Sequence, residues 1–259
     1  MDEAFAGIDV AFAKNKRLPV VVCRRRGSIL EPLELWKGRT KPPRGQGNAR
    51  ILKHEPVEEF AQRTAAYLRE VESEFGVQIR RVAIDAPSDP RPQGAPRRKA
   101  ETELDCRRIN CITTPDMGEF EAVCERARDH LARGEPESHL PGANVLWMLV
   151  GFALFRALRW NWECLEVFPQ AIAAVLGASK VHKSDDGGLV AQLSAAARYT
   201  GWPVPAVVAK LRPIGYGNKH DRLDGYLAAW VASLEESERE PFGEPPSDVI
   251  WVPRLEPAS

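Results

Sequence analysis

The chain contains 259 residues, of which 44% are hydrophobic and 28% are charged, as is usual for a folded protein with one large domain. Its 36 basic residues balance its 36 acidic residues, which excludes a polycation that binds nucleic acid over its whole surface. The five cysteines show no Cys-x-x-Cys spacing, and the longest apolar run, residues 145–155, is too short to span a bilayer. We therefore expect a cytoplasmic protein without membrane contact.

Three short strands are expected at the beginning of the chain. Residues 4–10 form an apolar run that ends at Asp9, and the β-rich runs 18–23 and 28–36 flank a glycine turn. The short links between these strands favour an antiparallel meander. The stretch that follows, residues 37–53, contains six basic residues and no acidic residue. It is either a solvated loop or a loop that contacts phosphate.

Helices and further strands follow along the rest of the chain. Residues 55–75 have helical periodicity, and residues 79–84 form a β-rich run that ends at Asp85. The segment 86–115 is rich in proline, arginine and glycine, and we expect it to cross the mouth of any site at Asp85. The other expected elements are helices at 117–133, 144–159, 170–177, 187–200 and 219–236, a short strand at 163–168 and a final edge strand at 249–252.

Carboxylates stand at the ends of these apolar segments. Asp9, Asp85 and Glu166 each lie at or near the end of a predicted strand, and Asp221 and Asp224 lie three residues apart on a predicted helix. Parallel strands would bring their carboxyl ends to the edge where open α/β sheets bind ligands. The two helical acids project from one helix face. Because a buried carboxylate is costly unless it is paired or coordinates a cation, we expect these acids to converge in one cleft.

Such a cluster suits a divalent metal. Mg²⁺ or Mn²⁺ prefers hard oxygen ligands, and two ions about 4 Å apart can activate water and stabilise the leaving oxygen in phosphodiester cleavage. The acids also have structural interpretations. Asp221 could cap its helix, and Asp9 and Asp85 could accept backbone hydrogen bonds at the strand ends. The joint placement of the acids favours the metal site.

The motifs that contain these acids form an ordered set: Gly7-Ile8-Asp9-Val10, Ala83-Ile84-Asp85-Ala86-Pro87, Glu166-Val167-Phe168-Pro169, and the run from Asp221 to Ala229. The set resembles the family catalogued as domain of unknown function 429, which is grouped with predicted nucleases of the ribonuclease H-like fold. The resemblance implies an α/β fold with a mixed five-stranded sheet, helices on both faces and a divalent-metal site. Carried onto this chain, the site consists of Asp9, Asp85, Glu166, Asp221 and Asp224. We expect one domain over residues 1–259, with a helical insertion at about 86–160.

Four basic residues are candidates for binding substrate phosphate. Lys14 follows Asp9 by five residues and could instead be a surface lysine. Arg97, Arg98 and Arg107 follow the turn after Asp85 and could steer a polyanion. Arg97 and Arg107 are also alternative partners for Glu166.

The leading hypothesis is a metal-dependent nuclease or related phosphodiesterase that hydrolyses nucleic acid. The alternative is a non-catalytic module on the same fold that binds nucleic acid or protein. A third hypothesis, a nucleotide phosphotransferase of the actin-like kind, requires Gly-rich phosphate loops in duplicate. The chain lacks a second Gly-rich hairpin, which argues against it.

Overall fold

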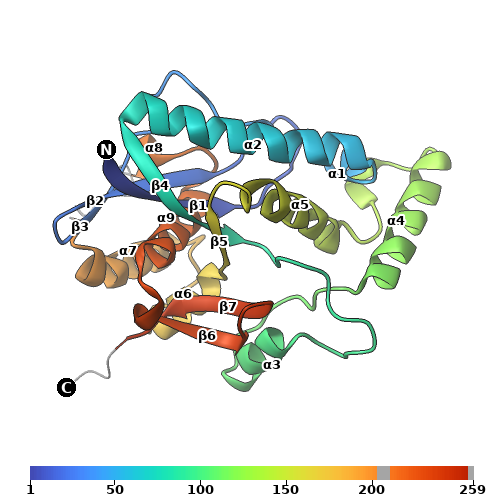
Figure 1. The fold of residues 1–259 in the computed structure, drawn as a ribbon. Helices are drawn as coiled ribbons and strands as arrows, with labels where there is room; N and C mark the ends of the chain where they lie inside the picture. Colours follow the sequence, from blue (N-terminus) through green and yellow to red (C-terminus); the bar gives the residue numbers. More distant parts are fainter. Residues whose placement is uncertain (203–210, 256–259) are drawn as a thin grey trace.

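A five-stranded mixed sheet forms the centre of the molecule (Figure 1). The structure is a computed structural model that describes residues 1–202 and 211–255. The spatial order of the strands is β3-β2-β1-β4-β5, in which β1, β4 and β5 are parallel and β2 is antiparallel to both of its neighbours. The strands are β1 (Asp2–Asp9), β2 (Val20–Arg26), β3 (Ile29–Pro32), β4 (Val77–Asp85) and β5 (Glu163–Glu166).

Helices cover both faces of the sheet and enclose two hydrophobic cores. The first core includes residues of α1 (Asn48–Ile51), α2 (His54–Phe75), α4 (Met117–Ala132) and α5 (Ala143–Leu158). The second includes residues of α3 (Lys99–Cys106), α6 (Pro169–Val175), α7 (Asp186–Thr200), α8 (Leu211–Ile214), α9 (Lys219–Ser233), and the hairpin of β6 (Arg239–Glu244) and β7 (Asp248–Pro253). Two short 3₁₀ turns complete the described elements, η1 (Glu137–His139) and η3 (Glu236–Glu238).

The first strand shows why both cores form. Successive side chains of a strand point to opposite faces. Ala4, Ala6 and Ile8 of β1 therefore enter the first core, whereas Phe5 enters the second. A central parallel strand is buried on both sides and is apolar throughout. The only charges of β1 are accordingly at its two ends, and the one at its carboxyl end is Asp9.

Most predicted elements are present, and the five-stranded mixed sheet is confirmed. Two expectations were wrong. The third strand ends at Pro32 instead of continuing to residue 36. The last strand, β7, pairs with β6 in a separate two-stranded sheet instead of forming an edge of the main sheet.

The unpredicted strand β6 has a physical explanation. Its sequence, Arg-Glu-Pro-Phe-Gly-Glu, contains proline and glycine, which are depleted in strands. It is a strand because β7 pairs with all six of its residues and Phe242 is buried in the second core. The hairpin touches the main sheet through a bridge between Trp251 and Val167.

The proposed insertion at 86–160 does not form a separate layer. Its last helix, α5, lies beside α2 on the sheet and supplies much of the first core. In the described part of the chain, no helix is long and apolar enough to cross a membrane.

Candidate metal centre

Two glycines bring α9 against β1. A Cβ atom added at Gly7 would lie 2.0 Å from the carbonyl oxygen of Gly225, and 2.4 Å from the amide nitrogen of Ala229. At Gly7, no side chain fits between the strand and the helix. The close approach places Asp224, the residue before Gly225, at the carboxyl end of β1, where Asp9 stands.

Three carboxylates meet at this point. Asp9 and Asp85 are register partners at the ends of the parallel strands β1 and β4. Asp224 reaches them from α9, and ligand oxygens of the three residues lie within 4.8 Å of one another. We call Asp9, Asp85 and Asp224 the acidic triad. Its oxygens are the hard ligands that Mg²⁺ and Mn²⁺ prefer, so the donor set fits a divalent ion.

One oxygen of the triad has no partner. Asp224 is only 4% exposed, and its Oδ1 atom forms no hydrogen bond with any described residue. A buried polar atom normally finds a partner, because leaving it unpaired costs about 1–3 kcal/mol, and more for a charged group. The orphaned oxygen therefore indicates a position prepared for a ligand.

The electrostatics of the triad favour a cation. Burial, followed by the charges of Asp85 and Asp224, raises the pKa of Asp9 well above its ordinary value. Burial and the charge of Asp224 raise the pKa of Asp85 to about 8. Burial also raises the pKa of Asp224, although Lys183 opposes this shift. Carboxylates so close together repel when ionised, and a bound divalent cation relieves that repulsion.

Lys183 lies beside the triad. It comes from the segment between α6 and α7, and its Nζ atom donates to Oδ2 of Asp224. Burial favours its neutral form, but the attraction of Asp224, Asp85 and Asp9 raises the pKa of Lys183 overall. One ammonium group balances one carboxylate, so the triad retains an excess of acid.

Asp221 lies next to the triad but serves the helix. One of its oxygens accepts a hydrogen bond from the backbone N–H of Asn218 at 2.6 Å, which is half of a capping box at the start of α9. The other oxygen lies 3.1 Å from His220 Nε2. Its charge nevertheless contributes to the raised pKa values of Asp9 and Asp224.

Glu166 is directed away from the triad by register. It pairs with Ile84 of β4, one residue before Asp85, and side chains alternate between faces along a strand. Its carboxylate forms two hydrogen bonds with Arg98, at 2.6 and 2.9 Å, and accepts a third from the backbone of Ser88 at 2.8 Å. Its partner is thus Arg98 rather than the expected Arg97 or Arg107.

The predicted substrate-binding residues divide into two groups. All three arginines are already paired with carboxylates of the chain: Arg98 with Glu166 and Asp248, Arg97 with Asp105, and Arg107 with Glu240. Lys14, in contrast, lines a hollow of about 720 Å³.

We call this hollow the basic hollow. Its positive side chains come from the loop after β1, from the 41–50 segment and from α2, and Glu137 is its one acidic residue. Its six cations are Lys14, Arg17, Lys41, Arg44, Arg50 and Arg63. Among the described residues, only Arg63 of these six forms an ion pair, with Glu59. Part of the basic stretch 37–53 thus lines a surface suited to an anion.

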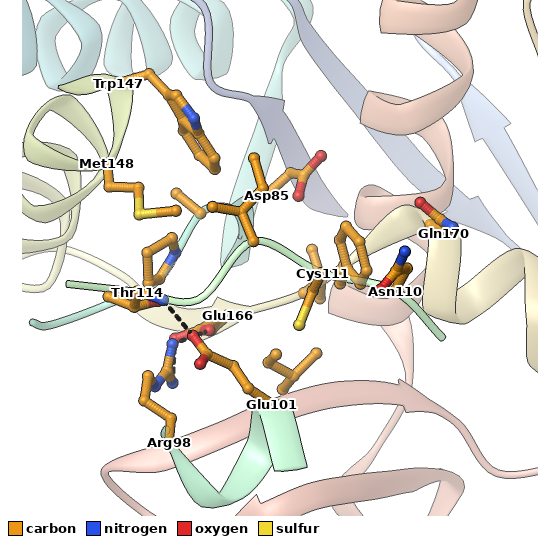
Figure 2. A pocket seen from close by; sticks show the side chains of 16 residues that line it. Asp85, Arg98, Glu101, Asn110, Cys111, Thr114, Trp147, Met148, Glu166 and Gln170 are labelled. Atoms are coloured by element: carbon orange, nitrogen blue, oxygen red, sulfur yellow. Dashed lines mark hydrogen bonds and ion pairs between the residues drawn. The ribbon is translucent and has the colours of Figure 1, made fainter. Parts of the chain in front are cut away.

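A second cavity lies against Asp85 (Figure 2). Its volume is about 380 Å³, and Trp147, Met148 and Phe168 are among its apolar walls. Sequence reasoning missed this cavity because its walls come from distant segments of the chain. It also missed Lys183, whose local sequence carries no motif.

No protein-family model, no curated protein and no solved structure matches this chain. The resemblance to the domain of unknown function 429 family therefore stays a prediction.

Proposed function

We propose that the protein is a divalent-metal-dependent phosphodiesterase that cleaves nucleic acid, with Asp9, Asp85 and Asp224 as the metal ligands. The observation that carries the proposal is the convergence of three carboxylates within 4.8 Å, one of them with a buried, unpartnered oxygen. Acids at the carboxyl ends of parallel strands stand where open α/β sheets bind ligands. Mg²⁺ and Mn²⁺ are the ions that suit this oxygen set.

The chemistry needed is hydrolysis of a phosphodiester. A bound ion would lower the pKa of a water molecule and neutralise charge on the phosphate. The water oxygen forms a bond to phosphorus, the bond from phosphorus to the leaving oxygen breaks, and that oxygen takes up a proton. Lys183, whose Nζ atom donates to Asp224, would supply a positive charge beside a phosphate bound at the triad.

The basic hollow supports a polyanionic substrate. The loop that begins after Asp9 contributes Lys14 and Arg17 to it, so the hollow and the acidic triad are both reached from the carboxyl end of β1. Phosphate backbones are bound by such clusters of lysine and arginine, with affinity that falls as salt rises. Net neutrality of the chain is compatible with this, because only the surface that faces phosphate must be positive.

The fold proposal is consistent with this function. The strand order with an antiparallel second strand, and acids at the ends of β1 and β4, are features expected of a ribonuclease H-like nuclease. Membership of that fold, and of the domain of unknown function 429 family, is part of the proposal. The second metal ion expected from the sequence also stays a prediction, because the triad includes only three of the five predicted ligands.

A cleavage assay tests the proposal. Labelled single-stranded and duplex DNA and RNA are incubated with Mg²⁺ or Mn²⁺, and with EDTA as the metal-free control. We expect turnover only with metal, and at least a 100-fold loss in both Asp9→Asn and Asp85→Asn. Asp89→Asn is the matched control, since Asp89 is exposed and, in the described part of the chain, its one ion pair is with Arg159. Cleavage that survives EDTA or both triad changes would refute the proposal.

The Lys183 contact favours one alternative, a non-catalytic module that binds nucleic acid or protein. An ammonium group that permanently neutralises Asp224 would reduce the need for metal. This alternative predicts salt-sensitive binding of nucleic acid without turnover, unchanged by Asp9→Asn and Asp85→Asn.

A further inference from the structure

The cavity beside Asp85 combines apolar and polar walls. Trp147 and Met148 of α5 stand on one side of it, and Asn110 and Gln170 stand on the other (Figure 2). Phe168 adds a second aromatic side chain. Large apolar walls with a few polar groups are typical of sites for small ligands, and about 380 Å³ lies at the small end of their usual range of about 300–1,000 Å³.

The polar groups suit the edge of a planar heterocycle. Asn110 and Gln170 are exposed side chains, and neither forms a hydrogen bond with another described residue. Each amide offers both donors and an acceptor. Side chains of this kind read nucleobase edges, while aromatic side chains stack on the faces of unstacked bases. The site offers both kinds of contact within one cavity.

The cavity and the acidic triad share a residue. Asp85 lines the cavity and also belongs to the triad, so a ligand in the cavity has its nearest end at the metal position. The buried pair of Arg98 and Glu166 closes another part of the wall, and Glu101 fixes the adjoining segment by accepting a hydrogen bond from the backbone of Thr114 at 2.8 Å. These contacts give the cavity rigid walls.

We propose that this cavity holds one unstacked nucleobase of the substrate, next to the phosphodiester at the acidic triad. The inference rests on the proposed function, because it assigns the metal position to the phosphate of the same nucleotide. A base can enter only when it leaves its stack, so the substrate class is single-stranded nucleic acid, a strand end or an extruded nucleotide. Stacking on Trp147 supplies the affinity, and the two amides hold the base edge.

The test separates base binding from cleavage. Adenosine, guanosine, cytidine and uridine, which carry no phosphate, are titrated into the metal-free protein by ligand-observed NMR, with ribose as the probe without a base. We expect binding of nucleosides but not of ribose, and a loss of about fivefold or more in Trp147→Ala. Gln170→Ala, at an exposed position, serves as the second variant because it leaves the core untouched. Trp160→Ala is the matched control, since Trp160 is 85% exposed and does not line the cavity.

The outcomes distinguish the two proposals. Nucleoside binding that is weakened in Trp147→Ala and retained in Trp160→Ala supports the base site, even where no cleavage is found and the phosphodiesterase proposal fails. Equal affinity for nucleosides and ribose overturns the base site. The base site is also overturned if nucleoside affinity is unchanged in both Trp147→Ala and Gln170→Ala. If the protein nevertheless shows metal-dependent cleavage, the phosphodiesterase proposal stands.

Discussion

The acidic triad and the Glu166 site both hold carboxylates at the carboxyl end of the sheet, but they balance the negative charge in different ways. Both place carboxylates at the carboxyl ends of parallel strands: Glu166 in one, Asp9 and Asp85 in the other. Glu166 has its counter-charge built in, because Arg98 is buried beside it and forms two hydrogen bonds with it. Among the residues that the structure describes, the triad has three carboxylates, one adjacent ammonium group and one orphaned oxygen. A buried acid at a strand end is therefore no evidence of a metal by itself, and the balance of local charge is what separates the two sites.

Glu166→Gln should produce the largest loss of stability. The change leaves the Arg98 guanidinium, 4% exposed, with Asp248 as its remaining carboxylate. Removing one partner of a buried ion pair costs about 3–5 kcal/mol. Urea unfolding measures the change. Glu3→Gln is the control, because Glu3 and its partner Arg80 are both about half exposed and the change should cost less than about 1 kcal/mol. Similar values for both variants would contradict a structural role of the Arg98 pair.

Gly7→Ala should cause the next largest effect, and of the two sites it should disturb only the triad. Its Cβ atom would overlap the backbone of α9, and overpacking of this kind costs about 3 kcal/mol. Because the helix must move away from β1, Asp224 moves with it, and we expect weaker Mn²⁺ binding as well as lower stability. Calorimetric titration and urea unfolding measure the two effects. Gly118→Ala in α4 is the control, because only Asp116 lies near its Cβ, at 3.5 Å.

Divalent metal should stabilise the triad and leave the Glu166 site unaffected. Wild-type protein in Mn²⁺ at about 100 times the dissociation constant should gain about 2.7 kcal/mol in its free energy of unfolding. Asp85→Asn should lose this gain, because the triad then lacks one ligand charge. Glu163→Gln should keep it. Denaturant unfolding with and without Mn²⁺ measures the gain, and an equal gain in Asp85→Asn would place the metal elsewhere.

The contrast between the two sites also shows how far sequence reasoning extends. Asp9 and Asp85 were predictable, since each is the charge that directly follows an apolar stretch, residues 4–8 before Asp9 and residues 82–84 before Asp85. Glu166 carries the same local signal, but its role depends on the register between β4 and β5, which places it beside Ile84. Local pattern does not encode that register. The strands of the sheet could be predicted because an apolar run is a local feature of the sequence. The register could not be predicted, because it depends on how distant strands pair.

Charge partners proved harder to predict than the acids. Arg97, Arg98 and Arg107 are equivalent in sequence terms, yet only Arg98 is buried against Glu166. Lys183 reaches Asp224 from a segment without a recognisable motif. The cavity beside Asp85 is lined by residues from β4, β5, α3, α5, α6 and β7 as well as loops. Such groupings arise only when the chain is folded, so they carry no periodic signal.

The smallest expected effect is a pH dependence of the metal-free protein. Burial and Asp224 raise the pKa of Asp85 to about 8, whereas the same group in the unfolded chain has a pKa near 3.8. Below pH 3.8, Asp85 is protonated in both the folded and the unfolded state, so its raised pKa does not lower the free energy of unfolding. As pH rises toward about 8 the unfolded chain releases the proton and the folded protein retains it, so stability falls.

Asp85→Asn removes the titrating carboxyl group. The part of the stability loss at high pH that comes from Asp85 should therefore disappear. Without divalent metal, we expect the variant and the wild type to be similar near pH 4, and the variant to be more stable at pH 8 by at least about 1 kcal/mol, which corresponds to one pKa unit. Urea unfolding at intervals between pH 4 and pH 8 measures the difference. Glu166→Gln should show a smaller gain, because burial raises the pKa of Glu166 but Arg98 opposes that shift. A wild type that gains stability relative to Asp85→Asn as pH rises would mean that Lys183 already balances the triad, and would favour the non-catalytic alternative.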